Sequence, residues 1–147
     1  MKNLPLTKLF KILLLALLLF SIFSITAGEM LFDTLPNILQ DYKTQVDNEY
    51  NSSDFSIIDV IFMPVAIFSI FAIIGVWKFK NWARHSYLII TIAFLPFYYI
   101  FGPVVMNHLE AMFNDLSFML NGILIYMMYM TPLSNEFKLK ANKNEKV

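Results

Sequence analysis

Four long runs of apolar residues alternate with short polar segments along the chain. These runs are residues 9–27, 57–77, 87–106 and 116–133. Within them only Lys11 and Asp59 are charged, and each lies near the end of its run. A hydrocarbon layer of about 30 Å is crossed by a helix of about 20 residues, which is close to the length of each run. The pattern therefore predicts an all-α membrane protein with four transmembrane helices.

The polar segment 28–56, between the first two runs, has a helical pattern of its own. Leu35, Leu39, Tyr42 and Val46 recur at the spacing of one helix face, with polar residues between them. We expect an amphipathic helix over residues 36–50, because Pro36 suits a first helical turn. We expect this helix to pack on the outer mouth of the bundle. The alternative is that it forms a docking surface for another protein.

The later runs are separated by short segments, residues 78–86 and 107–115. Short connections place consecutive helices side by side and antiparallel. The predicted architecture is an up-down bundle of four transmembrane helices in one domain, residues 1–137. The remaining residues, 138–147, are rich in Lys and Asn and lack periodicity, so we predict a mobile basic tail.

Composition supports a membrane location and narrows the chemistry. Hydrophobic residues make up 58% and aromatic residues 16% of the 147 residues, which is too apolar for a soluble domain of this size. The chain has no cysteine, so thiol chemistry and disulfides are excluded.

The charged residues predict an orientation. Of the 11 Lys and Arg residues, all but Lys43 fall in three segments, residues 2–11, 78–84 and 138–146. Of the 11 Asp and Glu residues, all but Glu136 and Glu145 fall in the alternate segments or beside them. Basic loops remain in the cytoplasm, so we predict a bacterial inner-membrane protein with both termini cytoplasmic.

The first apolar run admits a second interpretation. A basic start, a Leu-rich stretch and the small residues Ala27 and Gly28 also resemble a signal peptide with its cleavage site. The apolar stretch 12–27 is slightly long for that role, so we favour a retained helix. The orientation of the later spans is the same in either case.

Ionisable residues are absent from the middle of the predicted spans. Ion-coupled transporters and proton relays are usually marked by such residues, because burying them is costly unless function requires it. The sequence also lacks the G-x-S-x-G, His-Glu-x-x-His and Walker motifs. We therefore predict no catalytic residues, no cofactor and no nucleic-acid partner.

Polar residues gather at the predicted outer boundary, where Asp59, His108, Glu110 and Asp115 combine imidazole and carboxylate groups. Such groups bind divalent cations, but their spacing matches no ligand motif, so we predict no metal site. His85 lies beside Arg84 at the inner boundary. The segment 77–87 mixes aromatic and basic residues, which is typical of anchoring at the lipid headgroups, and we interpret His85 as part of that anchor.

The third predicted span contains Pro96 and Pro103, and each proline leaves a carbonyl unpaired four residues earlier. One of these carbonyls belongs to Tyr99. Counted from the outer ends of the apolar runs, Asn121 on the fourth span lies at a similar depth. We hypothesise that the Asn121 amide bonds the Tyr99 carbonyl, or the hydroxyl of Tyr98 or Tyr99, and holds the two helices in register.

Two segments carry a resemblance. The Asn-Trp-Ala-Arg turn at residues 81–84 and the helix end Tyr-Met-Thr-Pro-Leu-Ser at residues 129–134 resemble those of small bacterial four-span inner-membrane proteins with no assigned activity. The resemblance implies no catalytic residues. Our own first interpretation of the chain is a structural or accessory protein in contact with the lipid bilayer, and with a larger membrane complex or further copies of itself.

Two other functions stay open at this point. A binding protein of the bacteriocin-immunity type is compatible with the small size and the acidic outer segment. A small oligomeric channel or transporter is less favoured because the spans lack charge at their centres, although channels can be lined by carbonyls and hydroxyls.

Overall fold

The computed structural model describes residues 5–52, 57–96 and 104–138. These residues are all helical apart from turns and short connections, and they form six helices. In chain order they are α1 (Leu6–Met30), the short 3-10 helix η1 (Phe32–Thr34), α2 (Asn37–Ser52), α3 (Ile57–Trp77), α4 (Asn81–Phe94) and α6 (His108–Met130). Residues 134–138 add one more helical turn. The prediction of an all-α protein is confirmed.

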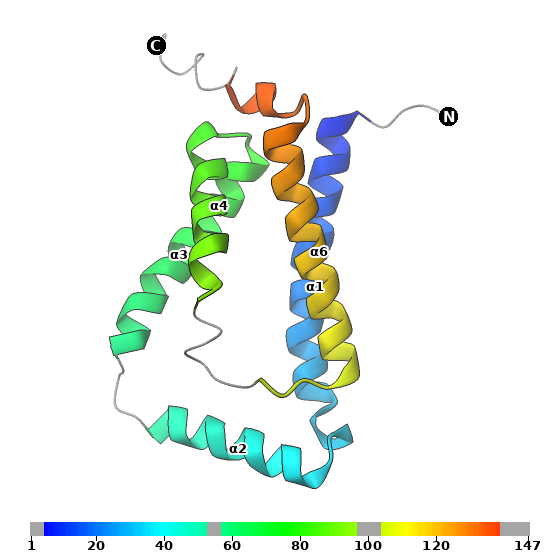
Figure 1. Cartoon of the computed structure of the whole chain (residues 1–147), viewed down its shortest axis with the longest axis vertical. Helices are drawn as coiled ribbons and strands as arrows, with labels where there is room; N and C mark the ends of the chain where they lie inside the picture. Colours follow the sequence, from blue (N-terminus) through cyan, green and yellow to red (C-terminus); the bar gives the residue numbers. More distant parts are fainter. Residues whose placement is uncertain (1–4, 53–56, 97–103, 139–147) are drawn as a thin grey trace.

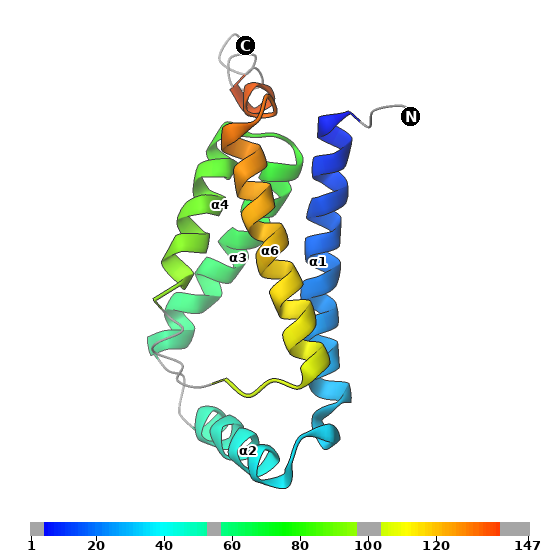
Figure 2. The same cartoon turned by 45° about the vertical axis from the view of Figure 1, so that its right-hand side comes forward.

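The long helices form two antiparallel pairs (Figure 1). One pair joins the first and last helices of the chain, α1 and α6, and the other joins the neighbours α3 and α4. Helix α2 crosses the end of the molecule that lies opposite both termini (Figures 1 and 2). The expected packing of α2 on the mouth of the bundle is not observed, because its apolar side chains stay largely exposed, with Ile38 81% and Val46 41% accessible.

The helix bounds agree with the predicted apolar runs in some places and differ from them in others. Helix α3 has the bounds of the second run, residues 57–77, and α2 matches the amphipathic helix predicted over residues 36–50 within two residues. Helix α1 extends the first run by three residues at each end. Helix α4 begins six residues before the third run, and residues 97–103 of that run lie outside the described residues.

The prediction of an outer loop over residues 107–115 is wrong, because α6 begins at His108. The cause is a capping box. The Asn107 side chain accepts a hydrogen bond from the Glu110 backbone N–H at 2.9 Å, and the Glu110 carboxylate accepts one from the Asn107 N–H at 3.3 Å. Two satisfied backbone donors start the helix at this point, so the charged residues that suggested a loop occupy its first turns.

The inner connection is also shorter than the predicted loop 78–86. Helix α3 ends in a Schellman motif, in which the Lys80 N–H bonds the Gly75 carbonyl at 2.9 Å and the Phe79 N–H bonds the Val76 carbonyl at 3.0 Å. The motif places Phe79 at φ 55°, a conformation that glycine usually supplies. Helix α4 then begins at once, at Asn81.

The packed core lies at the end of the molecule that carries the termini. Phe79 is 4% exposed there, and its ring centroid lies 5.7 Å from that of Phe10 and 5.2 Å from that of Phe137. The turn between α3 and α4 thus inserts an aromatic ring between the start of α1 and the segment that follows α6. This packing compensates for the strained backbone of Phe79, which costs about 1 to 2 kcal/mol.

Candidate functional site

The contact between α1 and α6 changes character along its length. The α1 residues that face α6 recur three and four apart, which is the spacing of an antiparallel helix seam. In chain order they are Phe10, Leu14, Leu17, Ser21, Ser24 and Gly28. On the other side, Glu110 and Ser117 of α6 and its N-cap Asn107 contact α1. The half of this seam nearer the termini is apolar, and the half nearer α2 is polar.

Hydrogen bonds hold the polar half together. The Asn107 amide donates to the Ala27 carbonyl at 2.8 Å, and Asn107 is 3% exposed. The Ser24 hydroxyl donates to the Glu110 carbonyl at 3.0 Å. Gly28 lets the helices approach closely, because a Cβ atom added there would lie 3.0 Å from the Glu110 carboxylate. Small residues and hydrogen bonds are the usual means of joining helices in lipid.

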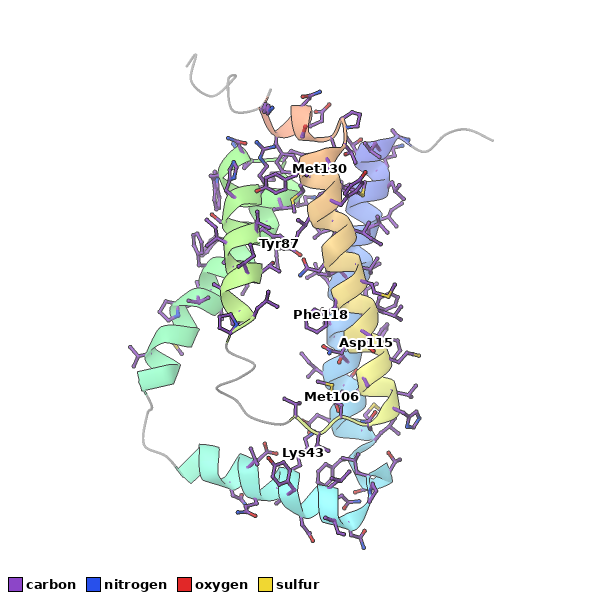
Figure 3. The ribbon with its side chains drawn as sticks, in the orientation of Figure 1. Lys43, Tyr87, Met106, Asp115, Phe118 and Met130 are labelled. Carbon is purple, nitrogen blue, oxygen red and sulfur yellow. The ribbon has the colours of Figure 1, made fainter. Side chains whose placement is uncertain are left out.

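A pocket of about 190 Å³ opens where the polar half meets α4. Its lining consists of Leu17, Ser21, Tyr87, Asn114, Ser117, Phe118 and Asn121. Figure 3 shows Tyr87 on α4 and Phe118 on α6 in the space between these two helices. The lining carries no charged side chain, so the pocket combines neutral hydrogen-bonding groups with the apolar walls of Leu17 and Phe118.

One hydrogen bond crosses this pocket. The Tyr87 hydroxyl donates to the Asn121 Oδ1 atom at 2.7 Å and joins α4 to α6. Asn121 therefore links the third and fourth predicted spans through Tyr87, a partner that was not predicted. Tyr98 and Tyr99 lie outside the described residues, so the hypothesised bond to the Tyr99 carbonyl, or to the hydroxyl of Tyr98 or Tyr99, stays a prediction.

Tyr87 was not predicted as the partner because the depth of Asn121 was counted from the wrong residue. The count began at residue 116, where the apolar run starts, whereas α6 begins at His108. At the end of the molecule near the termini, α4 begins and α6 ends. Tyr87 lies six residues, or about 9 Å, from that start, and Asn121 lies nine residues, or about 14 Å, from that end. A tyrosine side chain bridges that difference. The short turn at residues 78–80 fixes this register, and no glycine marks that turn in the sequence.

Two amide groups in the pocket are left without partners in the described part of the chain. The Asn121 NH₂ group is one, since only its Oδ1 atom is bonded. The whole Asn114 side chain is the other. The three hydroxyls of the lining already donate: Ser21 to Leu17 and Ser117 to Phe113, both at 2.9 Å, and Tyr87 to Asn121. The free capacity of the amides thus consists of the two NH₂ groups, which donate, and the Asn114 Oδ1 atom, which accepts.

The outer residues considered for a metal site do not come together. Glu110 closes the capping box, and His108 and Asp115 are exposed on the first turns of α6. The side chain of Asp59 lies outside the described residues. Within the described ranges, no three His, Asp or Glu side chains are placed to hold a metal ion.

A second polar cluster lies at the end of the molecule that carries the termini. Arg84 is 7% exposed, and its guanidinium lies 5.4 Å from the Tyr129 ring and 5.7 Å from the Phe137 ring. The Tyr129 hydroxyl donates to the Arg84 carbonyl at 3.1 Å and lies 3.3 Å from Nδ1 of His85. These contacts join α4 to the end of α6, which is a structural role for the Asn-Trp-Ala-Arg turn.

Comparison with protein-family models, with curated proteins and with solved structures found no match. The functional interpretation therefore rests on the residues of this chain.

Proposed function

We propose that this protein is a four-span bacterial inner-membrane protein with both termini in the cytoplasm, and that it serves as a non-catalytic accessory subunit of a larger membrane complex. Helices α1 and α6 are each long and apolar enough to cross a membrane. In this proposal α3, with 21 residues, is a further span, and the apolar run 87–106, which begins within α4, is the remaining one.

One observation carries the proposal: large apolar side chains are exposed on the outward faces of all four helices. Examples are Ile12, Leu19 and Ile25 on α1, Met63, Ile67 and Phe71 on α3, Ile89 and Ile92 on α4, and Met119, Ile123 and Tyr126 on α6. A soluble monomer rarely exposes apolar surface of this extent, whereas lipid tails or a partner helix would cover it without cost.

The two ends of the molecule support the orientation. The start of α1 with Lys8 and Lys11, the turn with Lys78 and Lys80, and the segment ending at Lys138 all lie at the same end (Figure 1). The acidic helix α2 lies at the other end. Basic segments gathered at one end agree with a cytoplasmic face there.

The hydrogen bond between Asn107 and Ala27 supports retention of α1. It lies at the residues that would form a signal-peptide cleavage site. Cleavage there would also remove Phe10, Leu14 and Leu17 from the core. We infer that α1 stays in the mature protein as its first span.

Cysteine accessibility tests the topology, because the chain has no cysteine of its own. The reagent is a membrane-impermeant maleimide, applied to three variants that each carry one cysteine. A cysteine at Asn48 should react in intact spheroplasts, whereas a cysteine at Lys80 or Asn142 should react only after lysis. The reverse pattern would overturn the orientation, and labelling of all three positions from one side would overturn the four spans.

Purification tests the accessory role. The full chain, solubilised in a mild detergent, should carry a membrane partner at fixed stoichiometry, and deletion of its gene should lower the abundance of that partner. A monomer that turns over a substrate by itself would contradict the proposal.

A further inference from the structure

We propose that the pocket between α1, α4 and α6 binds the head of a neutral, membrane-dissolved carbonyl compound of the quinone class. The inference rests on the proposed function only in that α1 and α6 cross the membrane. It concerns binding and includes no electron transfer.

The position of the pocket sets the route by which a ligand arrives. Asn121 lies about 14 Å from the end of α6 that is near the termini and about 20 Å from the other end, so it is close to the middle of the helix. In the proposed topology a pocket at that depth, lined by Tyr87 and Phe118, lies at the level of the hydrocarbon layer and away from water on either side. Its ligand must therefore dissolve in lipid.

The chemistry of the lining sets the ligand's polarity. With no charged side chain in the lining, a charged head would be desolvated without a counter-ion, at a high cost. The NH₂ groups of Asn121 and Asn114 are left unpaired and offer donors, and Asn114 Oδ1 offers one acceptor. A head with carbonyl oxygens meets both requirements, because it is neutral and it accepts hydrogen bonds.

The spacing of the two amides favours a head with acceptors at opposite edges. Asn114 and Asn121 are seven residues apart, on one face of α6 and about 10 Å apart along its axis. A ring with carbonyl oxygens at opposite edges spans a similar distance once a hydrogen bond of about 2.9 Å is added at each edge. Leu17 and Phe118 supply apolar walls for the faces of such a ring.

The size of the pocket limits what enters it. Its volume of about 190 Å³ is below the roughly 300 to 1,000 Å³ of sites that enclose a whole drug-sized ligand. One ring head fits, and a long tail would stay among the lipid chains. Water would otherwise fill the same space.

The variant Asn114→Leu distinguishes binding of a ring head from filling of the pocket by water. It keeps the size of the side chain, removes the amide, and breaks no hydrogen bond within the described residues. Gly122→Ala is the matched control, because it lies on the same helix and a Cβ atom there meets nothing within 4 Å.

Binding is measured on the full-length protein in nanodiscs with a photoreactive azido-benzoquinone that carries a ten-carbon tail. We expect saturable labelling, mapped by mass spectrometry to peptides around residues 114–121. Decylubiquinone should compete for the label and decylbenzene, which lacks carbonyls, should not. Asn114→Leu should weaken competition by decylubiquinone about three- to tenfold, and Gly122→Ala should leave it unchanged.

Three results would overturn the inference: labelling that does not saturate, competition by decylbenzene equal to that by decylubiquinone, or an unchanged affinity in Asn114→Leu. Failure here is distinguishable from failure of the proposed function. If the cysteines are labelled as expected but no ligand binds, only the ligand proposal is contradicted. If the cysteine labelling is reversed, the proposed topology is contradicted whatever the binding result.

Discussion

The two halves of the α1–α6 seam differ in what holds the helices together. Near the termini, Phe10 and Leu14 are fully buried among aromatic and aliphatic neighbours. Near α2, the contacts are those of Asn107 with Ala27 and Ser24 with Glu110. In lipid, an apolar side chain gains little from leaving the bilayer, so the apolar half depends on close packing. The polar half depends on satisfied hydrogen bonds, which also fix the register.

The largest effect is expected where three rings meet. Phe10→Ala empties a fully buried position next to Phe79 and Phe137 and should destabilise the fold by about 3 kcal/mol. This is the lower end of the range for such changes, since in the proposed membrane setting the unfolded helices stay in lipid. Reversible unfolding in mixed micelles measures the change. Ile12→Ala, at a position 52% exposed, is the control and should cost below 1 kcal/mol. Equal losses for the two variants would mean that the aromatic core is not formed.

A steric test follows at the turn between α3 and α4. A Cβ atom on Gly75 would lie 2.5 Å from the Ala83 Cβ, so Gly75→Ala forces the two helices apart. We expect a loss of about 2 kcal/mol, within the range for overpacking. The double variant Gly75→Ala with Ala83→Gly should recover most of it. Gly122→Ala, with open space around it, should change the free energy of unfolding by a few tenths of a kcal/mol. A Gly75→Ala protein as stable as the parent would contradict this packing.

The sequence predicted the elements that depend on local composition. The second run ends where Trp77 gives way to Lys78, and α3 ends there as well. The pattern of Leu39, Tyr42 and Val46 located α2. Local composition did not reveal the start of α6, because charged residues around a capping box resemble a loop until the reciprocal bonds of Asn107 and Glu110 are considered.

The candidate site depended on tertiary register, which local patterns do not contain. Asn121 stood out as an amide within an apolar run, but its partner Tyr87 looked like a boundary anchor. Only the short turn at Lys78–Lys80 brings Tyr87 to the depth of Asn121. The positive φ angle of Phe79 could not be predicted from the sequence either. No glycine marks the turn, and Phe10 and Phe137, whose rings pack on Phe79, are distant in the sequence.

The outer half of the seam is tested by separating the two roles of Asn107. Asn107→Ala removes both the helix cap and the bond to Ala27 and should cost about 1 to 2 kcal/mol. Asn107→Ser keeps a capping oxygen but removes the amide donor, so it should cost about half as much. Unfolding in mixed micelles measures both. An equal loss for the two variants would show that the cap contributes nothing, and no loss for Ser would show that the bond to Ala27 contributes nothing.

The smallest effect is expected at the hydrogen bond that joins the two helix pairs. Tyr87→Phe removes the donor and leaves Asn121 Oδ1 unpaired, and such bonds contribute about 0.6 to 1.7 kcal/mol in membranes. Asn121→Leu removes the acceptor, and the double variant closes a thermodynamic cycle. A coupling energy of at least about 0.5 kcal/mol is expected, because the two side chains contact each other directly. Additive losses would mean that Tyr87 and Asn121 act independently. The α3–α4 pair would then be joined to α6 by the aromatic end of the molecule alone, and the polar half of the seam would serve only to hold α6 against α1.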